Sequence, residues 1–197
     1  MGYLKADARA ELLLNTAKKL MQSEGYASVT ARKIAQESGA ALGHINRHFT
    51  SLSQLKCQAF LAVVHEKVAL HNARADALTG IDAVLVHLGE CHKTQHEIEL
   101  WREVSVLAHQ DRALHEIFIY AMNLWHRTLT DVITRGVSQQ ALRCHDTPSA
   151  TAWRLMALVL GLDTLAMHGV VNDNEERVHR DLLHIVRLEL QPDMCAR

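Results

Sequence analysis

Helix-breaking residues are scarce in this chain, and their scarcity limits its fold more than any other feature. Only two prolines and nine glycines occur in 197 residues. Between them the apolar residues recur every three or four positions, which is the spacing of one helical face. No stretch alternates apolar and polar residues in the manner of a half-buried strand. The sequence therefore predicts an all-α protein.

Glycines and capping residues divide the chain into short segments followed by longer ones. Ser51 and Gln54 have the spacing of a capping box, and Thr147 precedes a proline as an N-cap residue often does. The expected helices span residues 6–23, 31–38, 41–49, 51–78, 81–94, 97–108, 111–136, 148–169 and 174–190. The change in helix length predicts a small domain over residues 1–52 and a larger one over residues 53–197.

Charge separates these two parts. The chain as a whole has a net charge of −1, but residues 1–56 contain eight lysines and arginines against four acids. A locally basic region on a nearly neutral chain is typical of a protein that contacts nucleic acid through one domain.

Membrane insertion and export are not expected. The longest apolar-rich stretch, residues 155–171, is interrupted by Asp163 and His168 and lacks the roughly 18 uninterrupted apolar residues of a membrane span. The N-terminus shows no signal-peptide pattern. We therefore expect a cytoplasmic protein whose four cysteines are reduced thiols.

The three short N-terminal helices have matching apolar faces. The residues of these faces are Leu13, Ala17, Leu20, Met21, Ile34, Ala35, Ile45 and Phe49. A tight turn containing Gly39 joins the second and third helices, which is the geometry of a helix-turn-helix. The outward residues of the third helix are rich in hydrogen-bond donors and include no acid, a composition that suits the major groove of DNA.

The same region contains an ordered set of signature residues, which are Gly25, Tyr26, Thr30, Ala31, Arg32, Lys33, Ile34, Ala35, Ser38, Gly39, Gly43, Ile45, His48, Phe49 and Leu55. This set resembles the N-terminal signature of TetR-type transcriptional repressors. The resemblance implies a homodimer whose two recognition helices enter successive major grooves of a palindromic operator in double-stranded DNA.

The resemblance also implies individual DNA contacts. Thr30 is expected to contact phosphate at the start of the second helix, where free backbone N–H groups assist it. Arg32 is expected to reach a base edge, and Gly43 to let the backbone approach the DNA closely. His44 is expected to face the bases, and His48 to contact phosphate.

Two positions depart from the pattern of the family. Asn46 stands where the family usually has a tyrosine, and its amide can pair with adenine. Leu52 stands where a lysine is common, so Lys56 is expected to supply the missing phosphate contact one turn later. Arg47 completes the outward face of the third helix.

The region after residue 57 is richer in apolar residues than helices exposed on one side require. The resemblance implies an effector-binding and dimerisation domain, in which the last two helices form a four-helix bundle with their copies. A looser resemblance to the BetI-like branch, typified by a response to choline, is carried by residues 101–104, Ala108, Asp111, Leu114 and residues 157–162.

Aromatic residues in this region predict a site for an organic cation. Aromatic faces attract quaternary ammonium ions, especially beside an acid. The candidate effector contacts are Trp101, Ser105, His109, Tyr120, Trp125 and Asp163. The alternative is that the aromatic residues pack in the core or an interface, with Asp163 paired across a dimer.

Two other classes of function remain as alternatives. The pairs His87/Cys91 and His92/His96 each have i, i+4 spacing, which would suit a metal- or redox-responsive regulator. No tight cluster of three or four ligands occurs in the sequence, so no metal or other cofactor is expected. A helical enzyme with a helix-turn-helix-like domain is the other alternative, but HExxH, GxSxG and P-loop motifs are missing. A non-enzymatic, ligand-responsive repressor is the leading hypothesis.

Overall fold

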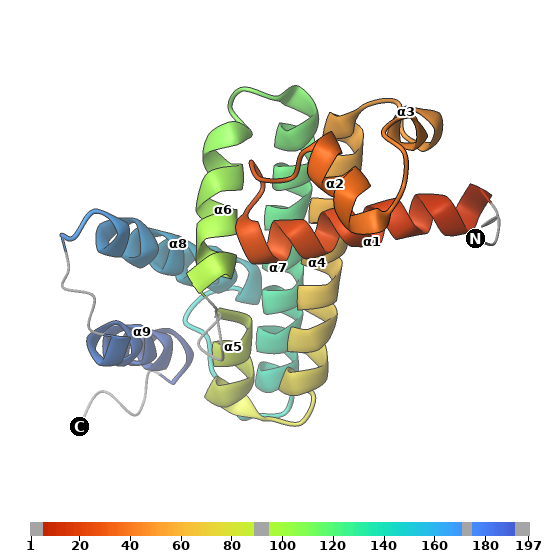
Figure 1. Ribbon diagram of the computed structural model, residues 1–197. Coiled ribbons are helices and arrows are strands. Elements are labelled where there is room, and N and C mark those ends of the chain that lie inside the picture. The colour runs from red at the N-terminus through yellow and green to blue at the C-terminus, as the bar shows by residue number, and fades with distance from the viewer. Residues whose placement is uncertain (1–5, 89–94, 171–174, 192–197) are drawn as a thin grey trace. The chain divides into compact units, whose positions relative to one another are not determined.

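The computed structural model describes residues 6–88, 95–170 and 175–191. Within these ranges the regular elements are all α-helices (Figure 1). They are α1 (Ala6–Glu24), α2 (Ala31–Ser38), α3 (Gly43–His48), α4 (Leu52–Ala75), α5 (Gly80–Leu88), α6 (Gln95–Leu107), α7 (Arg112–Ser138), α8 (Pro148–Met167) and α9 (Glu175–Leu190). The all-α prediction is confirmed for this part of the chain.

The capping residues act largely as the sequence predicted. Ser51 Oγ accepts the Gln54 N–H at 3.0 Å, while the Gln54 side chain accepts the Thr50 N–H at 2.8 Å rather than that of the cap residue itself. Thr147 accepts the Ala150 N–H, and a proline follows it in the first helical turn. Both caps satisfy backbone donors that a helix start leaves unpaired.

Helices α3 and α4 are each shorter than expected because one end tightens. Helix α3 begins at Gly43 rather than at residue 41, since the His44 N–H binds the Ala41 carbonyl three residues back. Helix α4 ends at Ala75 rather than at residue 78, since the Leu78 N–H likewise binds a carbonyl three residues back. Such i to i+3 bonds are typical of helix termini.

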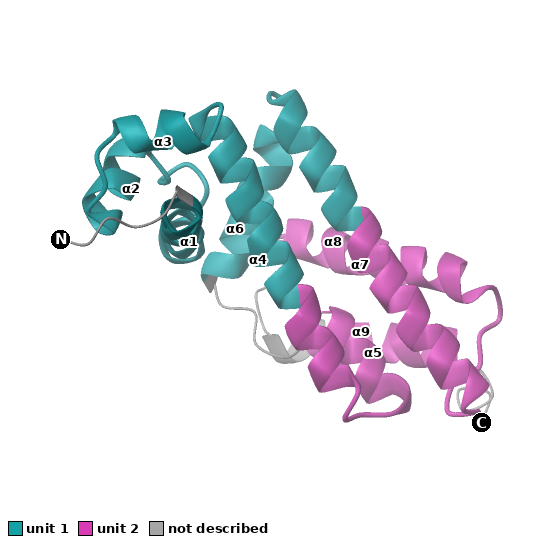
Figure 2. Ribbon diagram, turned by 90° about the vertical axis from the view of Figure 1, so that its right-hand side faces the viewer, with its two compact units in different colours: residues 1–67, 93–122 teal, residues 68–92, 123–197 magenta. Residues whose placement is uncertain are grey.

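The chain divides into two compact units (Figure 2). Unit 1 comprises residues 1–67 and 93–122, and unit 2 comprises residues 68–92 and 123–197. Helices α4 and α7 each contribute to both units. This division reflects which residues pack together. The boundary expected after residue 52 instead reflects the change in helix length along the sequence, and it stays a prediction.

The core of unit 1 forms where α1 packs against α2, α3 and α6. The apolar faces predicted for the first three helices are buried, except that Ala35 is only partly buried. Burial of these side chains supplies the main force that holds α2 and α3 against α1, because helices of six or eight residues are marginal alone.

The core of unit 2 forms where α5, α8 and α9 pack together. Leu155, Met156 and Val159 of α8 are buried in it, but Leu160 and Leu165 are 46% and 42% exposed. Within the single chain only one face of α8 packs inward, and the four-helix bundle expected with a second copy stays a prediction for the outer face.

Helix α8 alone, within the described ranges, is long and apolar enough to cross a membrane by length and composition. The sequence predicted no such helix, because Asp163 interrupts the apolar run. Core helices of globular proteins meet the same criteria. Here the inward face of α8 belongs to the core of unit 2.

Candidate nucleic-acid interface and effector region

Helices α2 and α3 form the helix-turn-helix, and the turn between them depends on Gly39. This residue has a φ of 66°, a left-handed conformation that residues with a side chain adopt only at a cost. At the other end of α2, Thr30 Oγ1 accepts the Lys33 N–H at 3.2 Å. Both ends of α2 are thus set by local sequence.

Helix α3 turns one face inward and the other to solvent. Ile45 is buried, whereas Gly43, Asn46 and Arg47 are exposed. The two histidines of α3 are partly buried. A Cβ atom placed on Gly43 would meet nothing within 4 Å, so internal packing does not require glycine there. The outer face combines the exposed backbone of Gly43 with an amide and a guanidinium, and the last two are groups that can read base edges.

Arg9 of α1 lies beside this face and was missed by the sequence reasoning. Its Nη1 atom is 3.3 Å from Nδ1 of His44. The basic excess of the first 56 residues was the available signal, but only the fold brings this particular cation next to α3. Arg9 is a further candidate for a phosphate contact.

Lys56 is partly buried, unlike Asn46 and Arg47 of α3. Its Nζ atom lies 4.0 Å from the ring centroid of Tyr26, and burial lowers the pKa of Lys56 while the nearby Glu103 opposes that shift. Tyr26 is itself buried, and burial raises its pKa. Lys56 therefore packs the segment between α1 and α2 against α4, and its phosphate contact stays a prediction.

Trp101, the first of the predicted effector residues, lies in an aromatic cluster of unit 1. Its ring meets Phe60 edge to face with centroids 5.2 Å apart, and Phe118 with centroids 6.4 Å apart. Phe60 is fully buried and Trp101 partly so. The cluster packs α4, α6 and α7 together and leaves part of the indole accessible.

The other predicted effector residues of unit 1 form their own contacts. Ser105 Oγ donates to the carbonyl of Arg102, and His109 Nδ1 lies 2.9 Å from the carbonyl of Ser105. Tyr120 is exposed, with its hydroxyl 3.2 Å from His65 Nε2. The spacing of Trp101, Ser105 and His109 places them along one side of α6 and the turn that follows it.

The remaining two candidates lie in unit 2. Trp125 Nε1 donates to the carbonyl of His87 at 2.7 Å, and the indole packs against the core. Asp163 is partly buried on α8. The candidates thus belong to two separate units, and their common site stays a prediction.

His87 is a buried polar residue that the sequence reasoning considered only as part of a metal pair. It is 2% exposed, and its ring lies edge to face with that of His71. Its Nε2 atom has no hydrogen-bond partner among the described residues. Burial lowers the pKa of His87 to about 4, assisted by Arg135 and opposed by Asp76. The imidazole is therefore neutral near physiological pH.

The predicted metal pairs cannot be described together, because Cys91 and His92 lie outside the described residues. Within the described ranges, no group of three or more His, Cys, Asp or Glu side chains is arranged to hold a metal ion.

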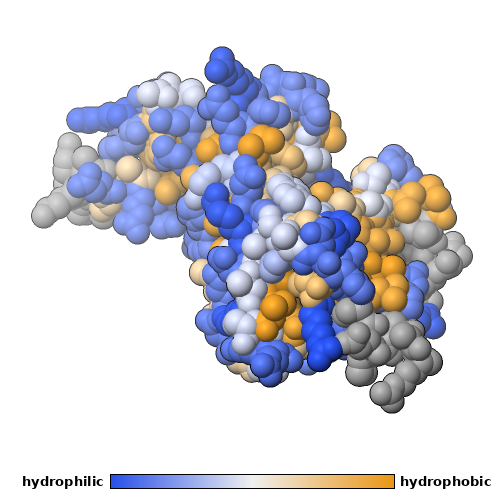
Figure 3. Space-filling view, turned by 180° about the vertical axis from the view of Figure 1, so that it is seen from behind, coloured by the Kyte–Doolittle hydropathy of each residue, from blue (hydrophilic) through white to orange (hydrophobic). Residues whose placement is uncertain are grey.

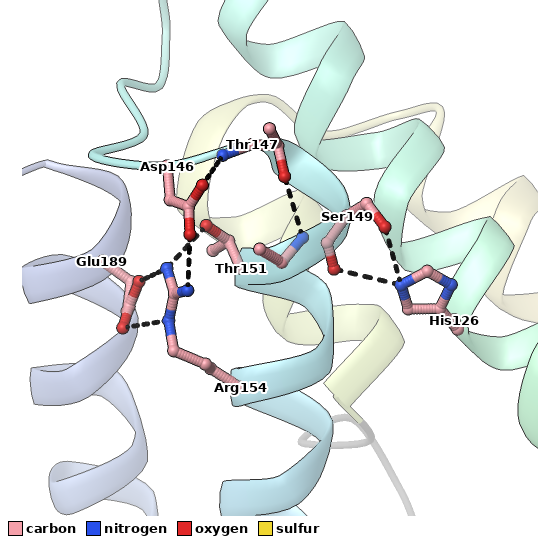
Figure 4. A network of polar contacts seen from close by, with 8 residues as sticks. His126, Asp146, Thr147, Ser149, Thr151, Arg154 and Glu189 are labelled. Atoms are coloured by element: carbon pink, nitrogen blue, oxygen red, sulfur yellow. Dashed lines mark hydrogen bonds and ion pairs between the residues drawn. The ribbon is translucent and has the colours of Figure 1, made fainter.

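A polar network joins the start of α8 to α7 and α9 (Figure 4). Arg154 donates to both carboxylate oxygens of Glu189, at 2.9 and 2.7 Å, and to Asp146 at 3.1 Å. These bonds raise the pKa of Arg154. On the other side, His126 Nε2 lies 3.0 Å from the Ser149 carbonyl. The network fixes α8 and α9 relative to each other.

Each unit also contains a surface hollow. One of about 300 Å³ in unit 1 is lined by Ser23, Glu24, Gly25, His96, Glu99 and Glu103. One of about 500 Å³ in unit 2 lies between α5 and α9, and its lining includes Asp82 and Arg187. Neither lining includes a predicted effector residue.

Two family models match the chain. Residues 13–55 match the model of bacterial regulatory proteins of the tetR family, and residues 73–191 match that of the C-terminal region of BetI-type transcriptional repressors. The second match alone covers more than half of the chain. The chain belongs to the TetR family. The resemblance stated from the sequence is thereby confirmed, and TetR membership favours a DNA-binding regulator over an enzyme.

Solved structures agree with this TetR assignment. A regulator from Saccharomonospora viridis in complex with choline has a TM-score of 0.74 and 21% identity, with 94% of this chain and 98% of that chain covered. The multidrug-binding protein EbrR complexed with proflavin has a TM-score of 0.64 and 20% identity, with coverage of 90% and 99%. A TetR-family regulator from Cytophaga hutchinsonii has a TM-score of 0.75 and 15% identity, with coverage of 96% and 98%.

At these identities the likeness shows a shared fold. No curated protein matches the chain.

Proposed function

We propose that this TetR-family protein is a cytoplasmic repressor that binds a palindromic operator as a homodimer and leaves it when a small organic cation binds. The observation that carries the proposal is the outer face of α3, where Gly43, Asn46 and Arg47 are exposed on a helix with no acid. A helix of this composition, held on a helix-turn-helix core, suits the major groove.

Roles on the DNA follow from these positions. Asn46 and Arg47 read base edges, together with Arg32 from α2 and His44. Thr30 and His48 contact phosphate. The Thr30 hydroxyl already accepts the capping N–H, but a hydroxyl can still donate its own proton to a phosphate oxygen. The N-terminus of α2 adds backbone donors of the favourable sign.

Dimerisation uses the exposed apolar residues of α8 and α9. Leu160, Leu165 and Met167 of α8 and Leu188 of α9 are 37–48% exposed. Figure 3 shows apolar surface gathered on the side of the molecule where α8 lies. Because Arg154 and Glu189 fix α8 to α9, the pair presents one preformed surface to a second copy. Burying such a surface against its own copy gives a four-helix bundle.

The proposed effector is an organic cation. Trp101, Tyr120 and Trp125 offer aromatic faces, Asp163 offers negative charge, and relatives of the same fold were solved with choline and with proflavin. Effector binding favours a conformation in which the recognition helices no longer match half-sites about 34–36 Å apart.

Selection from randomised duplex DNA tests operator binding. The full chain is incubated with the duplex pool at near-physiological salt, because the phosphate contribution depends on salt. Bound sequences are then recovered, and the mass of the protein is measured by sedimentation. A recovered palindrome and a dimeric mass are expected. Failure to enrich any sequence, with the protein folded and dimeric, contradicts the proposal.

A titration with choline and with proflavin then tests release. An effector that weakens operator binding must itself bind more weakly, by the same factor, when operator is present. If either compound binds equally well with and without operator, it is not an effector of this protein.

A further inference from the structure

A carboxylate on α6 binds the segment that leads into the helix-turn-helix. Glu103 accepts the Tyr26 N–H at 2.6 Å and the Ala27 N–H at 2.7 Å, using one carboxylate oxygen for each. Charge-assisted bonds of this kind are stronger than bonds between neutral groups. Two segments far apart in the sequence, both in unit 1, are thus joined at two points.

The backbone at Gly25 leaves room for the Glu103 carboxylate. Gly25 has a φ of 87°, and a Cβ atom placed on it would lie 2.9 Å from an Oε atom of Glu103. Glycine is therefore needed both for the left-handed conformation and for the close approach of the carboxylate.

The bound segment controls where α2 begins. Tyr26 is buried, Ala27 follows it, and Thr30 caps α2 three residues later. On the other side, α6 is anchored by the fully buried Val104, the neighbour of Glu103. A shift of α6 would therefore pull on the segment that positions α2 and α3.

A second carboxylate makes a matching contact after α3. Asp111, in the turn between α6 and α7, accepts the Ser53 hydroxyl of α4 at 2.9 Å. The same side chain accepts the Leu114 N–H at the start of α7. The helix-turn-helix is thus held from α6 and its following turn on both flanks, before α2 by Glu103 and after α3 by Asp111.

We propose that Glu103 is the positioning residue through which α6 and the DNA-binding helices sense each other. The proposal rests on the proposed function, because α6 also contains the predicted effector contacts Trp101 and Ser105. A displacement of α6 by effector moves the Glu103 carboxylate and, with it, the segment before α2. By linkage, operator binding alters α6 through the same two hydrogen bonds.

The first measurement needs no DNA. Amide hydrogen exchange of Tyr26 and Ala27 is compared in the wild-type chain, Glu103→Ala, Glu103→Gln and the control Glu99→Ala, which removes a carboxylate from the same hollow. Exchange of both amides is expected to rise roughly tenfold or more in Glu103→Ala. Glu103→Gln should give a smaller rise, because one amide oxygen replaces two acceptors, and Glu99→Ala none. Unchanged exchange in Glu103→Ala overturns the proposal.

The second measurement adds operator duplex. In the wild-type chain and in Glu99→Ala, DNA binding is expected to change exchange along α6. In Glu103→Ala, DNA should still bind while the response of α6 becomes smaller, because the contact between Asp111 and Ser53 remains. A response of α6 equal to that of the wild-type chain overturns the coupling role and leaves the proposed function intact. Failure of the wild-type chain to bind any duplex overturns the proposed function, and the coupling role with it.

Discussion

The predicted DNA-contact region and the predicted effector region of this protein are encoded over different ranges of sequence. Thr30, Arg32 and the α3 residues lie within a stretch of about twenty residues, and a turn and a cap set their positions. The predicted effector residues extend from α6 to α8 and lie in both compact units. A site of the first kind can be recognised from spacing, whereas a site of the second kind depends on long-range packing.

The largest expected effect is a loss of stability, and it distinguishes the buried face of α8 from the exposed one. Leu155→Ala removes a fully buried side chain and should lower the free energy of unfolding by about 2–5 kcal/mol. Leu160→Ala, at a position that is 46% exposed, should cost under about 0.5 kcal/mol in the monomer. Urea unfolding at several protein concentrations measures both.

Unfolding at several protein concentrations separates the stability of the fold from the stability of the dimer. Leu160→Asp should shift the chain toward the monomer in sedimentation while keeping its helical circular dichroism. If Leu160→Ala lowers the free energy of unfolding by as much as Leu155→Ala at every protein concentration, the outer face of α8 is not a dimer surface.

The second prediction concerns acid and the core of unit 2. Burial lowers the pKa of His87 from 6.5 to about 4, with Arg135 adding to the shift, Asp76 opposing it and the His71 ring alongside. Between pH 6.5 and 4, His87 is therefore protonated in the unfolded chain and neutral in the folded chain. The contribution of neutral His87 to the free energy of unfolding is complete above pH 6.5. It falls as the pH drops toward 4, by about 3 kcal/mol at 1.36 kcal/mol per pKa unit.

Replacing the imidazole checks this prediction. His87→Leu should flatten the loss of stability between pH 6.5 and 4, whereas His115→Gln, at an exposed histidine of α7, should leave it in place. Denaturant midpoints measured across this range decide the matter. An equal slope in wild-type and His87→Leu proteins would assign the acid sensitivity to other groups.

Sequence reasoning succeeded where local chemistry decides the structure. The Gly39 turn, the Thr147 cap and the buried Ile34 and Ile45 all follow from spacing along one helix or one turn. The outward placement of Asn46 follows from the same helical periodicity.

It failed where distant segments meet. Nothing local indicates that Glu103 binds the backbone before α2, that Arg9 reaches His44, or that Lys56 lies on Tyr26. Periodicity likewise shows that a helix such as α8 has apolar sides but not which side meets the chain's own core.

The third prediction concerns the DNA contacts of α3, which local sequence predicts. Asn46→Ala should weaken operator binding by about 1–3 kcal/mol, roughly 5- to 150-fold, and relax preference at the base it reads. Arg112→Ala, on the exposed first turn of α7, is the control and should leave the affinity unchanged. Binding to the selected palindrome and to single-base variants measures both. If Asn46→Ala weakens every sequence equally, the amide contacts phosphate rather than a base.

The smallest expected effect distinguishes two glycines of the same motif. Gly39→Ala places a side chain at a φ of 66° and should destabilise the fold by about 1–2 kcal/mol. At Gly43 neither a positive φ nor a neighbouring atom within 4 Å opposes a Cβ, so Gly43→Ala should be neutral or stabilise by up to about 1 kcal/mol. Operator binding should nevertheless weaken, because the added methyl group separates the α3 backbone from DNA. Thermal unfolding and operator affinity, measured on both variants, test this opposition. A Gly43→Ala protein that binds operator as well as the wild type would show that the open space at Gly43 is not filled by DNA.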